Sequence, residues 1–382
     1  MRCSEDITSN RFRGNGIPAI VVCLILASVG LFVPGTALGA GGLLTGVNVV
    51  NPQRRDAAVQ QRTLDELTRA GVRTIRVPLS VPYPASVDFA RRASARGLAV
   101  VLAIMTANPR AARPGVVPRD GHGATWAMLP LSGLAPRPFL DDLGEAFAEL
   151  ERNRVNIAAF EFGNEINWTP FNGDFPLPGR GRVLSLDELQ STGEGRAIAA
   201  GYDVYLELLR GVRRRLDRSP VYRRTPLISA GLSDPGPSGP RRGRTMDAVS
   251  VEATLQYLKA RGLDRLVQGY GVHFYPRTDA GEANADARLD AVLDLCSPAA
   301  DSAAKPCWLT EWGLRADPGD CGDAGPRPRL AAALIDRFKR YAAAGRLRAA
   351  IYYAWGEGAG RFAVFRCGRL SPTGRAVLDG GS

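Results

Sequence analysis

Histidine is nearly absent from this chain. Its 382 residues include only two histidines, His122 and His273, and no two cysteines have CxxC spacing. Histidine and closely spaced cysteines are the usual protein ligands of zinc, so the sequence cannot build a histidine-rich metal site. A hydrolase that depends on such a site is therefore excluded, and we expect neither a metal nor a redox cofactor.

Lysine is scarce as well. Only three lysines accompany 46 arginines, and the formal charge of the chain is +11. The arginines are spread along the whole sequence, and no basic run alternates with aromatic residues as in nucleic-acid-binding segments. We predict no nucleic-acid partner, while a general attraction to anionic polysaccharide or envelope surfaces stays open.

No change of composition divides residues 41–382, which form one predicted catalytic domain. Residues 1–40 differ, because Arg2, Arg11 and Arg13 precede an uncharged run over 17–33 and small residues follow it, as at signal-peptidase sites. The run is slightly shorter than the roughly 18 residues that span a bilayer, so an uncleaved membrane anchor is the alternative to a cleaved signal peptide. Either way we expect an exported monomer, periplasmic or extracellular.

Cysteine usage agrees with export. Cys3 and Cys23 fall within the predicted signal, and the other four cysteines are in the last quarter of the chain. An even number of cysteines in an exported domain indicates disulfides, here two. Four cysteines allow three pairings, of which we favour Cys296 with Cys307 and Cys321 with Cys367.

Short apolar segments alternate with longer amphipathic ones over 41–382. The amphipathic segments have helical spacing, and several are followed by a glycine at which the chain can turn, such as Gly71 and Gly345. The strand candidates are 45–50, 74–79, 99–104, 157–162, 227–231, 269–275, 308–311 and 350–355. Eight strand-helix units predict an α/β fold with a single (β/α)8 TIM barrel.

Two of the predicted strands end at a glutamate. The fourth is followed by Gly163-Asn164-Glu165, and the seventh ends with Glu311. Carboxylates contribute little to packing and the carboxyl ends of barrel strands form the binding face, so both are candidate catalytic groups. They are 146 residues apart, and only closure of a barrel can bring them together. Glu161, on the same strand as Glu165, is the alternative candidate and otherwise supports Glu165 from below.

These motifs resemble the retaining glycoside hydrolases of clan A, a cellulase-like group that includes glycoside hydrolase families 5 and 39. The resemblance covers the whole mature chain. It rests on Gly163-Asn164-Glu165, His273-Phe274-Tyr275, Thr310-Glu311-Trp312-Gly313, Arg76 and Trp355, in that placement on the strands. The cellulase-like pattern has a histidine after strand three, whereas this chain has none there and Asn108 is available instead, so the family 39 type fits about as well.

The resemblance implies two catalytic roles. Glu165 would be the acid/base and Glu311 the nucleophile, with the two carboxyl groups about 5 to 5.5 Å apart. Arg76 would keep Glu311 ionised, although pairing with Glu161 is an alternative role for this arginine. Tyr275 would orient Glu311.

The resemblance also implies substrate contacts. Asn164 would bind the sugar 2-hydroxyl, and Trp355, together with Trp312, would form an apolar platform for a sugar ring. His273 would lie near the acid/base, or would be an ordinary core histidine.

We therefore expect a retaining β-glycoside hydrolase of class EC 3.2.1.- that cleaves O-glycosidic bonds of a polysaccharide or oligosaccharide. The alternative is an exported carbohydrate-binding barrel that is weakly active or inactive. The presence of both Glu165 and Glu311 disfavours that alternative.

Overall fold

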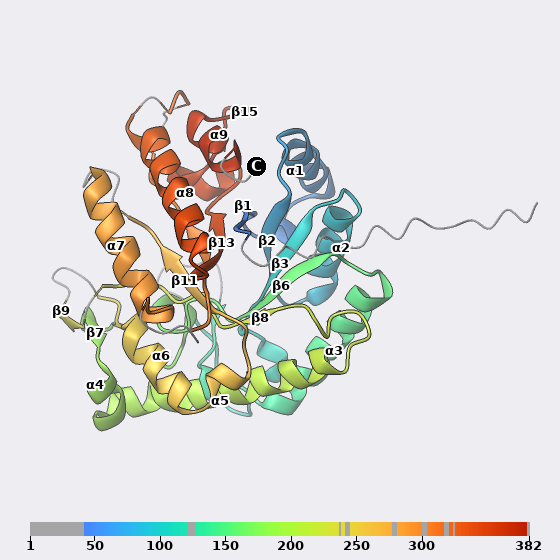
Figure 1. The fold of residues 1–382 in the computed structure, drawn as a ribbon. Coiled ribbons are helices and arrows are strands. Elements are labelled where there is room, and N and C mark those ends of the chain that lie inside the picture. The colour runs from blue at the N-terminus through green and yellow to red at the C-terminus, as the bar shows by residue number, and fades with distance from the viewer. Residues whose placement is uncertain are drawn as a thin grey trace, which may run out of the picture. The chain divides into compact units, whose positions relative to one another are not determined.

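Eight parallel strands form a closed barrel in the computed structural model (Figure 1). In chain order they are β1 (Leu44–Asn48), β2 (Thr74–Leu79), β3 (Ala99–Ile104), β6 (Ile157–Phe162), β8 (Leu227–Ile228), β11 (Tyr270–Phe274), β12 (Cys307–Trp312) and β13 (Leu347–Tyr352). Strand β13 pairs with β1, and parallel bridges from Ile228 to Gly269 and from Leu232 to Val272 join β8 to β11. The predicted TIM barrel is thereby confirmed.

The structure describes residues 42–120, 127–236, 238–240, 245–276, 281–299, 304–316, 321–323 and 325–379. The predicted signal over 1–40 and His122 lie outside these residues. Residues from Leu38 onward form one compact unit. None of the helices within the described ranges is both long and apolar enough to cross a bilayer.

Helices connect the strands and cover the outside of the barrel. They are α1 (Ala57–Arg69), α2 (Tyr83–Ser94), α3 (Pro136–Arg152), α4 (Leu186–Ser191), α5 (Gly193–Asp217), α6 (Val251–Ala260), α7 (Gly281–Cys296), α8 (Arg327–Ala343) and α9 (Pro372–Asp379). The long helices between the strands present apolar faces to the sheet, whereas α4 packs on α5 and α6. In α3, for example, Phe139, Leu143, Phe147 and Leu150 recur with helical spacing and are buried.

Smaller elements decorate the loops. They are β4 (Arg119–Asp120), β5 (Ala127–Met128), β7 (Arg182–Leu184), β9 (Gly239–Pro240), β10 (Ala248–Val249), β14 (Phe365–Arg366) and β15 (Arg369–Leu370). Strands β7, β9 and β10 form a three-stranded sheet in the segments that follow β6 and β8, and β14 pairs with β15 in the segment after β13.

The predicted eighth strand is displaced by three residues. It was expected over 350–355, whereas β13 is Leu347–Tyr352. The apolar sequence continues without a break through Trp355, so composition alone does not mark where the sheet ladder stops. As a result Tyr353 and Trp355 belong to the segment that follows the strand.

Two hydrophobic layers hold the barrel together. A small inner cluster that includes Val101, Ala159, Ile228, Trp308 and Ile351 fills the barrel. A much larger cluster packs the outward faces of the strands against the helices. The polar residues of the candidate site lie beyond the inner cluster, at the carboxyl ends of the strands.

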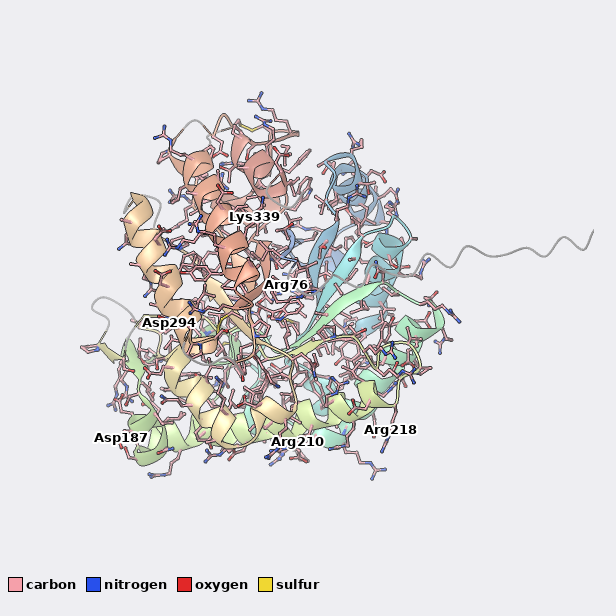
Figure 2. The ribbon with its side chains drawn as sticks, in the orientation of Figure 1. Arg76, Asp187, Arg210, Arg218, Asp294 and Lys339 are labelled. Atoms are coloured by element: carbon pink, nitrogen blue, oxygen red, sulfur yellow. A yellow bond between two sulfur atoms is a disulfide. The ribbon has the colours of Figure 1, made fainter. Side chains whose placement is uncertain are left out.

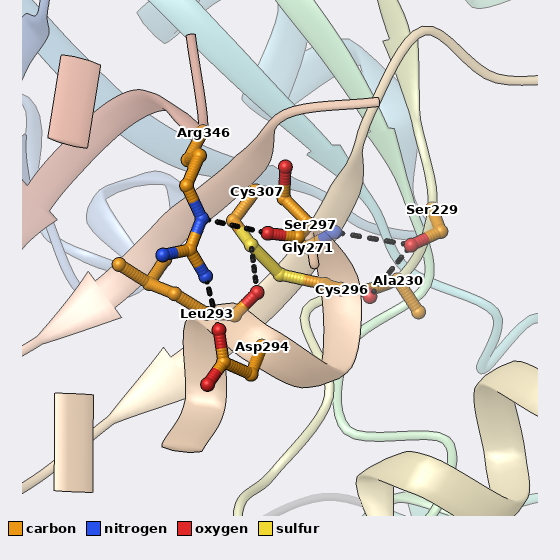
Figure 3. Close-up of a disulfide and its surroundings, with 9 residues drawn as sticks. All are labelled: Ser229, Ala230, Gly271, Leu293, Asp294, Cys296, Ser297, Cys307 and Arg346. Carbon is orange, nitrogen blue, oxygen red and sulfur yellow. Dashed lines mark hydrogen bonds and ion pairs between the residues drawn. A yellow bond between two sulfur atoms is a disulfide. The ribbon is translucent and has the colours of Figure 1, made fainter. Parts of the chain in front are cut away.

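Two disulfides close loops in the last quarter of the chain, with the favoured pairing. Cys296, the last residue of α7, is joined to Cys307, the first residue of β12, with Cα atoms 5.7 Å apart (Figure 3). Cys321 is joined to Cys367 with Cα atoms 5.9 Å apart, which ties the segment after β12 to the turn between β14 and β15. Two disulfides fit an exported protein.

The two disulfides are expected to differ in their effect on stability. They enclose segments with sequence separations of 11 and 46 residues. By chain entropy, replacing the pair Cys321 and Cys367 with serine should cost about 1 kcal/mol more than replacing Cys296 and Cys307, within a usual range of about 2 to 5 kcal/mol. Denaturant unfolding of the chain from Leu38 measures both, and a titratable thiol in that folded chain would contradict the pairing.

Candidate active site

Glu311 enters the site through an irregularity in β12. The parallel pairing with β11 matches Val272 to Leu309 but His273 to Glu311, so Thr310 is an extra residue in this strand. A bulge interrupts the alternation of side chains across a sheet. Here it lets the side chains of both Thr310 and Glu311 reach the barrel interior, where each makes a polar contact described below.

Glu165 is held by an unusual backbone conformation. Strand β6 ends at Phe162, and Gly163 then adopts φ +92° while Glu165 adopts φ +44°. A left-handed conformation is uncommon for a non-glycine residue and is found preferentially at functional sites. The amide of Glu165 donates to the carbonyl of Gly231, 2.7 Å away, which anchors this turn to the segment after β8.

Arg76 of β2 is the cation at the centre of the site (Figure 2). Its Nε lies 2.5 Å from Oε2 of Glu161, and its Nη1 lies 2.7 Å from Oε1 of Glu311. Arg76 therefore contacts both of the carboxylates that were considered as its partners. Its remaining donors contact amide oxygens, those of Asn48 and Asn164, each at 2.8 Å.

Glu161 lies beneath the site and is fully buried. One of its oxygens accepts from Arg76, and the other accepts from the hydroxyl of Thr310 at 2.6 Å. Both oxygens are thus occupied by protein donors, which leaves this carboxylate in a supporting position. The structure places Glu165 at the open side, as expected, with Glu161 below it.

His273 lies between the two candidate carboxylates. Its Nδ1 is 2.8 Å from Oε1 of Glu165 and 3.5 Å from Oε2 of Glu311. One ligand atom from each of these three residues lies within 4.8 Å of the other two. One oxygen of Glu165 and one of Glu311 thus lie within 4.8 Å of each other, a close approach that favours the narrow spacing of about 5 to 5.5 Å between carboxyl groups.

The three residues are also the one cluster among the described ranges whose geometry would suit a metal ion. The guanidinium of Arg76 already contacts Glu311 and supplies positive charge at this position. A divalent cation bound here would face that guanidinium at close range, where like charges repel strongly. The donor set therefore suits a proton better than a metal.

The surroundings shift the pKa values of Glu165 and Glu311 in opposite directions. Burial raises the pKa of Glu165 above its usual range, and the charge of Glu311 adds to this, while the hydrogen bond from His273 offsets it only in part. Burial acts in the same sense on Glu311, but the charges of His273 and Arg76 and the hydroxyl of Tyr275 outweigh it and hold the pKa of Glu311 below its usual range. One group is thus prepared to carry a proton and the other to stay ionised.

Aromatic residues line the open side of Glu311. The hydroxyl of Tyr275 donates to Oε2 of Glu311 at 2.5 Å, while 38% of this residue is exposed. The rings of Tyr353 and Phe362 pack edge-on against Tyr275, with centroids 6.0 and 5.3 Å away. Burial and the charges of Glu311 and Glu165 raise the pKa of Tyr353 to about 12, so its hydroxyl is close enough to sense both carboxylates.

Tyr353 and Phe362 were missed in the sequence. Both follow β13; Tyr353 falls within the strand expected over 350–355, and Phe362 lies beyond it. The signal that was available is the position of Tyr353, which comes directly after the last residue of the observed strand. It was overlooked because a tryptophan two residues later is a more conspicuous candidate for a sugar platform.

The two tryptophans are corrections. Trp312 is fully buried on the outside of the barrel, where it packs edge-on against Phe338 of α8 and Tyr352 of β13 at centroid distances of 4.9 and 4.8 Å. The bulge at Thr310 is the physical reason, because it places Glu311 inward and so turns the next residue outward. Trp312 therefore cannot form a sugar platform.

Trp355 also lies away from the carboxylates. It is 4% exposed and stacks on Phe365 at 5.0 Å. It lines a cavity of about 330 Å³ whose other walls include Val59 and Thr63 of α1. Glu165 and Glu311 do not line this cavity, and the aromatic residues beside Glu311 are Tyr275 and the ring that packs on it, Tyr353.

Asn164 retains a free amide nitrogen. Its Oδ1 accepts from Arg76, so its Nδ2 is the remaining donor, and within the described chain this nitrogen has no partner. Asn108 is different, because its Nδ2 donates to Asp142 of α3 at 2.8 Å. The amide of Asn108 is therefore used in a contact within the protein, and Asn108 does not take the place of the histidine of the cellulase-like pattern.

Comparisons with known proteins support the fold. No family model matches the sequence, and no curated protein sequence matches it. Among solved structures, the chain is similar to the exo-β-1,4-mannosidase Op5Man5 from Opitutaceae bacterium strain TAV5, with TM-score 0.52 and 13% identity over 90% of this chain and 60% of that one. It is also similar to Gas2 from Saccharomyces cerevisiae, with TM-score 0.50 and 12% identity over 90% and 66%.

A third structure is a GH128 endo-β-1,3-glucanase from Amycolatopsis mediterranei in complex with laminaritriose, with TM-score 0.46 and 14% identity over 89% of this chain and 100% of that one. The chain spans less than two thirds of the length of Op5Man5 and Gas2. At such low identity the likenesses to Op5Man5 and Gas2 support the (β/α)8 fold alone, and the function has to be argued from the site.

The opposite pKa shifts predict opposite effects of two isosteric substitutions on stability. Because the pKa of Glu165 is raised in the fold, its ionisation is penalised, so Glu165→Gln should raise the melting temperature at pH 8 and have little effect at pH 4. Because the pKa of Glu311 is lowered, Glu311→Gln should lower the melting temperature at pH 8, with the difference disappearing as the pH falls through that lowered pKa.

The matched control is Glu145→Gln, at an exposed position on α3, which should leave the melting temperature unchanged at every pH. Thermal melts of the three variants over this pH range are the measurement. Shifts of the same sign in Glu165→Gln and Glu311→Gln at pH 8 would contradict the assignment of opposite protonation states.

Proposed function

We propose that this protein is a retaining β-glycoside hydrolase. The observation that carries the proposal is the pair Glu165 and Glu311, buried at the carboxyl ends of barrel strands, with oppositely shifted pKa values and oxygens within 4.8 Å. Glycoside hydrolysis by double displacement needs one protonated and one ionised carboxyl group at such a spacing. The (β/α)8 fold is compatible with this chemistry but does not by itself imply it.

In the first step Glu311 attacks the anomeric carbon while Glu165 protonates the departing glycosidic oxygen. The bond from the anomeric carbon to that oxygen breaks as the bond to Glu311 forms, which gives a covalent glycosyl-enzyme. Arg76 and Tyr275 both donate to Glu311, so they keep its carboxylate ionised and oriented before attack.

In the second step a water molecule attacks the glycosyl-enzyme. Glu165, now deprotonated, accepts a proton from this water, and Glu311 departs as a carboxylate. Esterification removes the negative charge of Glu311, which is one of the causes that raise the pKa of Glu165. The change of role from acid to base therefore follows from the electrostatics of the pair.

The neighbouring residues suit a sugar ring in this position. The free Nδ2 of Asn164 is a donor for a hydroxyl next to the anomeric carbon, and Tyr275 and Tyr353 provide aromatic surface beside Glu311. The similarity to Op5Man5, an exo-β-1,4-mannosidase, supports β-linked oligosaccharides as the first substrates to test.

Chemical rescue tests the two roles separately. With an aryl β-glycoside that the wild type cleaves, Glu165→Ala and Glu311→Ala should each lower kcat by at least about 100-fold, a loss typical of general acid–base groups. Sodium azide should restore turnover in both. The Glu165 variant should give the β-glycosyl azide, because azide attacks the covalent intermediate, and the Glu311 variant should give the α-glycosyl azide, because azide replaces the nucleophile.

Glu145→Ala on the outer surface is the matched control and should keep wild-type rates. Reversed azide stereochemistry would exchange the roles of Glu165 and Glu311. Unchanged turnover in both variants would overturn the proposal, as would the absence of activity on every member of a panel of β-linked glucans, mannans, xylans and aryl glycosides.

Stereochemistry and pH dependence give a further expected outcome. Proton NMR of the first product from a β-linked substrate should show the β-anomer before mutarotation, whereas an initial α-anomer would mean inversion. The rate should rise with pH as Glu311 ionises and fall as Glu165 loses its proton, which gives a bell-shaped profile. For a dinitrophenyl glycoside, whose leaving group needs no protonation, the alkaline fall of the glycosylation rate should be absent.

A further inference from the structure

The two rims of the barrel carry very different charge. The N-terminal rim consists of the seven segments that connect a helix to the next barrel strand, and they hold ten basic and only two acidic residues. The basic residues are Arg73, Arg96, Arg154, Arg218, Arg223, Arg224, Arg261, Arg265, Lys305 and Arg346, and the acidic ones are Asp264 and Asp301. In the eight segments that leave the carboxyl ends of the strands, fifteen basic residues are balanced by thirteen acidic ones.

These segments form one continuous rim. The carbonyl of Arg73 accepts from Ala99, that of Pro226 accepts from Phe160, and that of Arg346 accepts from Cys307, each at 2.9 Å. Each bond links the last residue of one segment to a neighbouring strand, at the first residue of β3 and β12 and at the fourth residue of β6. The basic residues therefore gather at one end of the barrel, opposite the candidate active site.

Helix dipoles explain only part of this charge. Basic side chains in the last turn of a helix interact favourably with its carboxyl end, but the effect falls off within that turn. Arg223 and Arg224 lie six and seven residues beyond the end of α5, and Arg73 lies four residues beyond the end of α1. These positions have no dipole to complement.

Several arginines of the rim have no ionic partner. Arg96, Arg261 and Arg346 pair with aspartates, the last of them with Asp294 beside a disulfide (Figure 3). Others are exposed and make no ion pair within the described chain, and Arg218 among them marks the end of α5 in Figure 2. They are Arg73, Arg218, Arg223, Arg224 and Arg265.

The apolar run of the sequence is attached at this same rim. Strand β1 begins at Leu44, and the carbonyl of Gly42 accepts from Arg348 at the start of β13. The run over 17–33 is connected to Gly42 by eight residues, which reach at most about 28 Å when extended. If that run spans a bilayer, the bilayer surface is close enough for the exposed arginines of the rim to reach it.

From these observations we propose that the N-terminal rim docks on the headgroups of an anionic phospholipid bilayer. Guanidinium groups bind phosphate in a bidentate manner, and each one near an anionic membrane strengthens attachment about fivefold. The attachment point of the apolar run favours a membrane over a soluble polyanion. Docking in this way would direct the carboxyl ends of the strands, with Glu165 and Glu311, away from the membrane. This inference does not depend on the proposed hydrolase activity.

Vesicle binding tests the rim without the apolar run. The chain from Leu38 is suitable, because all eight barrel strands and the whole described core lie within it. It should sediment with phosphatidylcholine vesicles that contain phosphatidylglycerol and not with phosphatidylcholine alone. Binding should disappear at about 1 M salt, where the Debye length is about 3 Å.

Replacing Arg218, Arg223, Arg224 and Arg265 together with glutamine should weaken binding at least about 100-fold. The matched control replaces four exposed arginines near the opposite rim by glutamine, namely Arg54, Arg55, Arg329 and Arg369, which make no ion pair with any residue that the structure describes. It removes the same net charge and should bind nearly as the parent does.

Equal losses in the two quadruple variants would overturn the proposal, because net charge rather than the rim would then be responsible. So would equal binding to both kinds of vesicle. Binding to heparin in place of phosphatidylglycerol, with the same loss in the rim variant, would identify a polyanion as the partner and contradict the membrane assignment. Circular dichroism melts of both variants confirm that folding is retained.

Discussion

One guanidinium holds the candidate site together. Arg76 is buried among two carboxylates and two amide oxygens, and their negative charges raise its pKa although burial opposes this. A buried carboxylate without a partner is costly, and neither Glu161 nor Glu311 has another cation as close. Arg76 pairs with both carboxylates. The buried Glu161 therefore holds the guanidinium in place, and the guanidinium in turn holds the carboxylate of Glu311. Glu311 is therefore positioned by a buried layer that lies below it.

Two backbone irregularities bring the polar side chains of the site together above this layer. The bulge at Thr310 lets two consecutive residues of β12 face the interior, where Thr310 contacts Glu161 and Glu311 contacts Arg76 and Tyr275. After β6, the left-handed conformation of Glu165 has a comparable effect. It turns the chain so that the side chain of Glu165 contacts His273. Regular strands would alternate and could not present such closely placed polar groups.

The sequence predicted the regular part of the molecule well and the irregular part poorly. Eight apolar segments separated by amphipathic ones specify a barrel because both patterns arise from burial, which composition records directly. The glutamates were found for the same reason, since a charge at the end of an apolar strand has no packing role. Trp312 was misplaced because a bulge leaves no mark in composition. Tyr353 was missed because the ladder ends within an unbroken apolar run, where only the three-dimensional pairing shows the boundary.

Gly231 has a consequence for how this barrel can diversify. A Cβ atom at this position would collide with Nε2 of His273 and with the side-chain oxygens of Glu161 and Thr310, so the floor of the site has no space for even one added methyl group. A side chain added at Gly231 would displace Glu161 and His273, and with them the contacts that position Arg76 and Glu165. A library intended to alter ligand preference should therefore leave the strands untouched and vary the segments that follow β3, β6, β8 and β13.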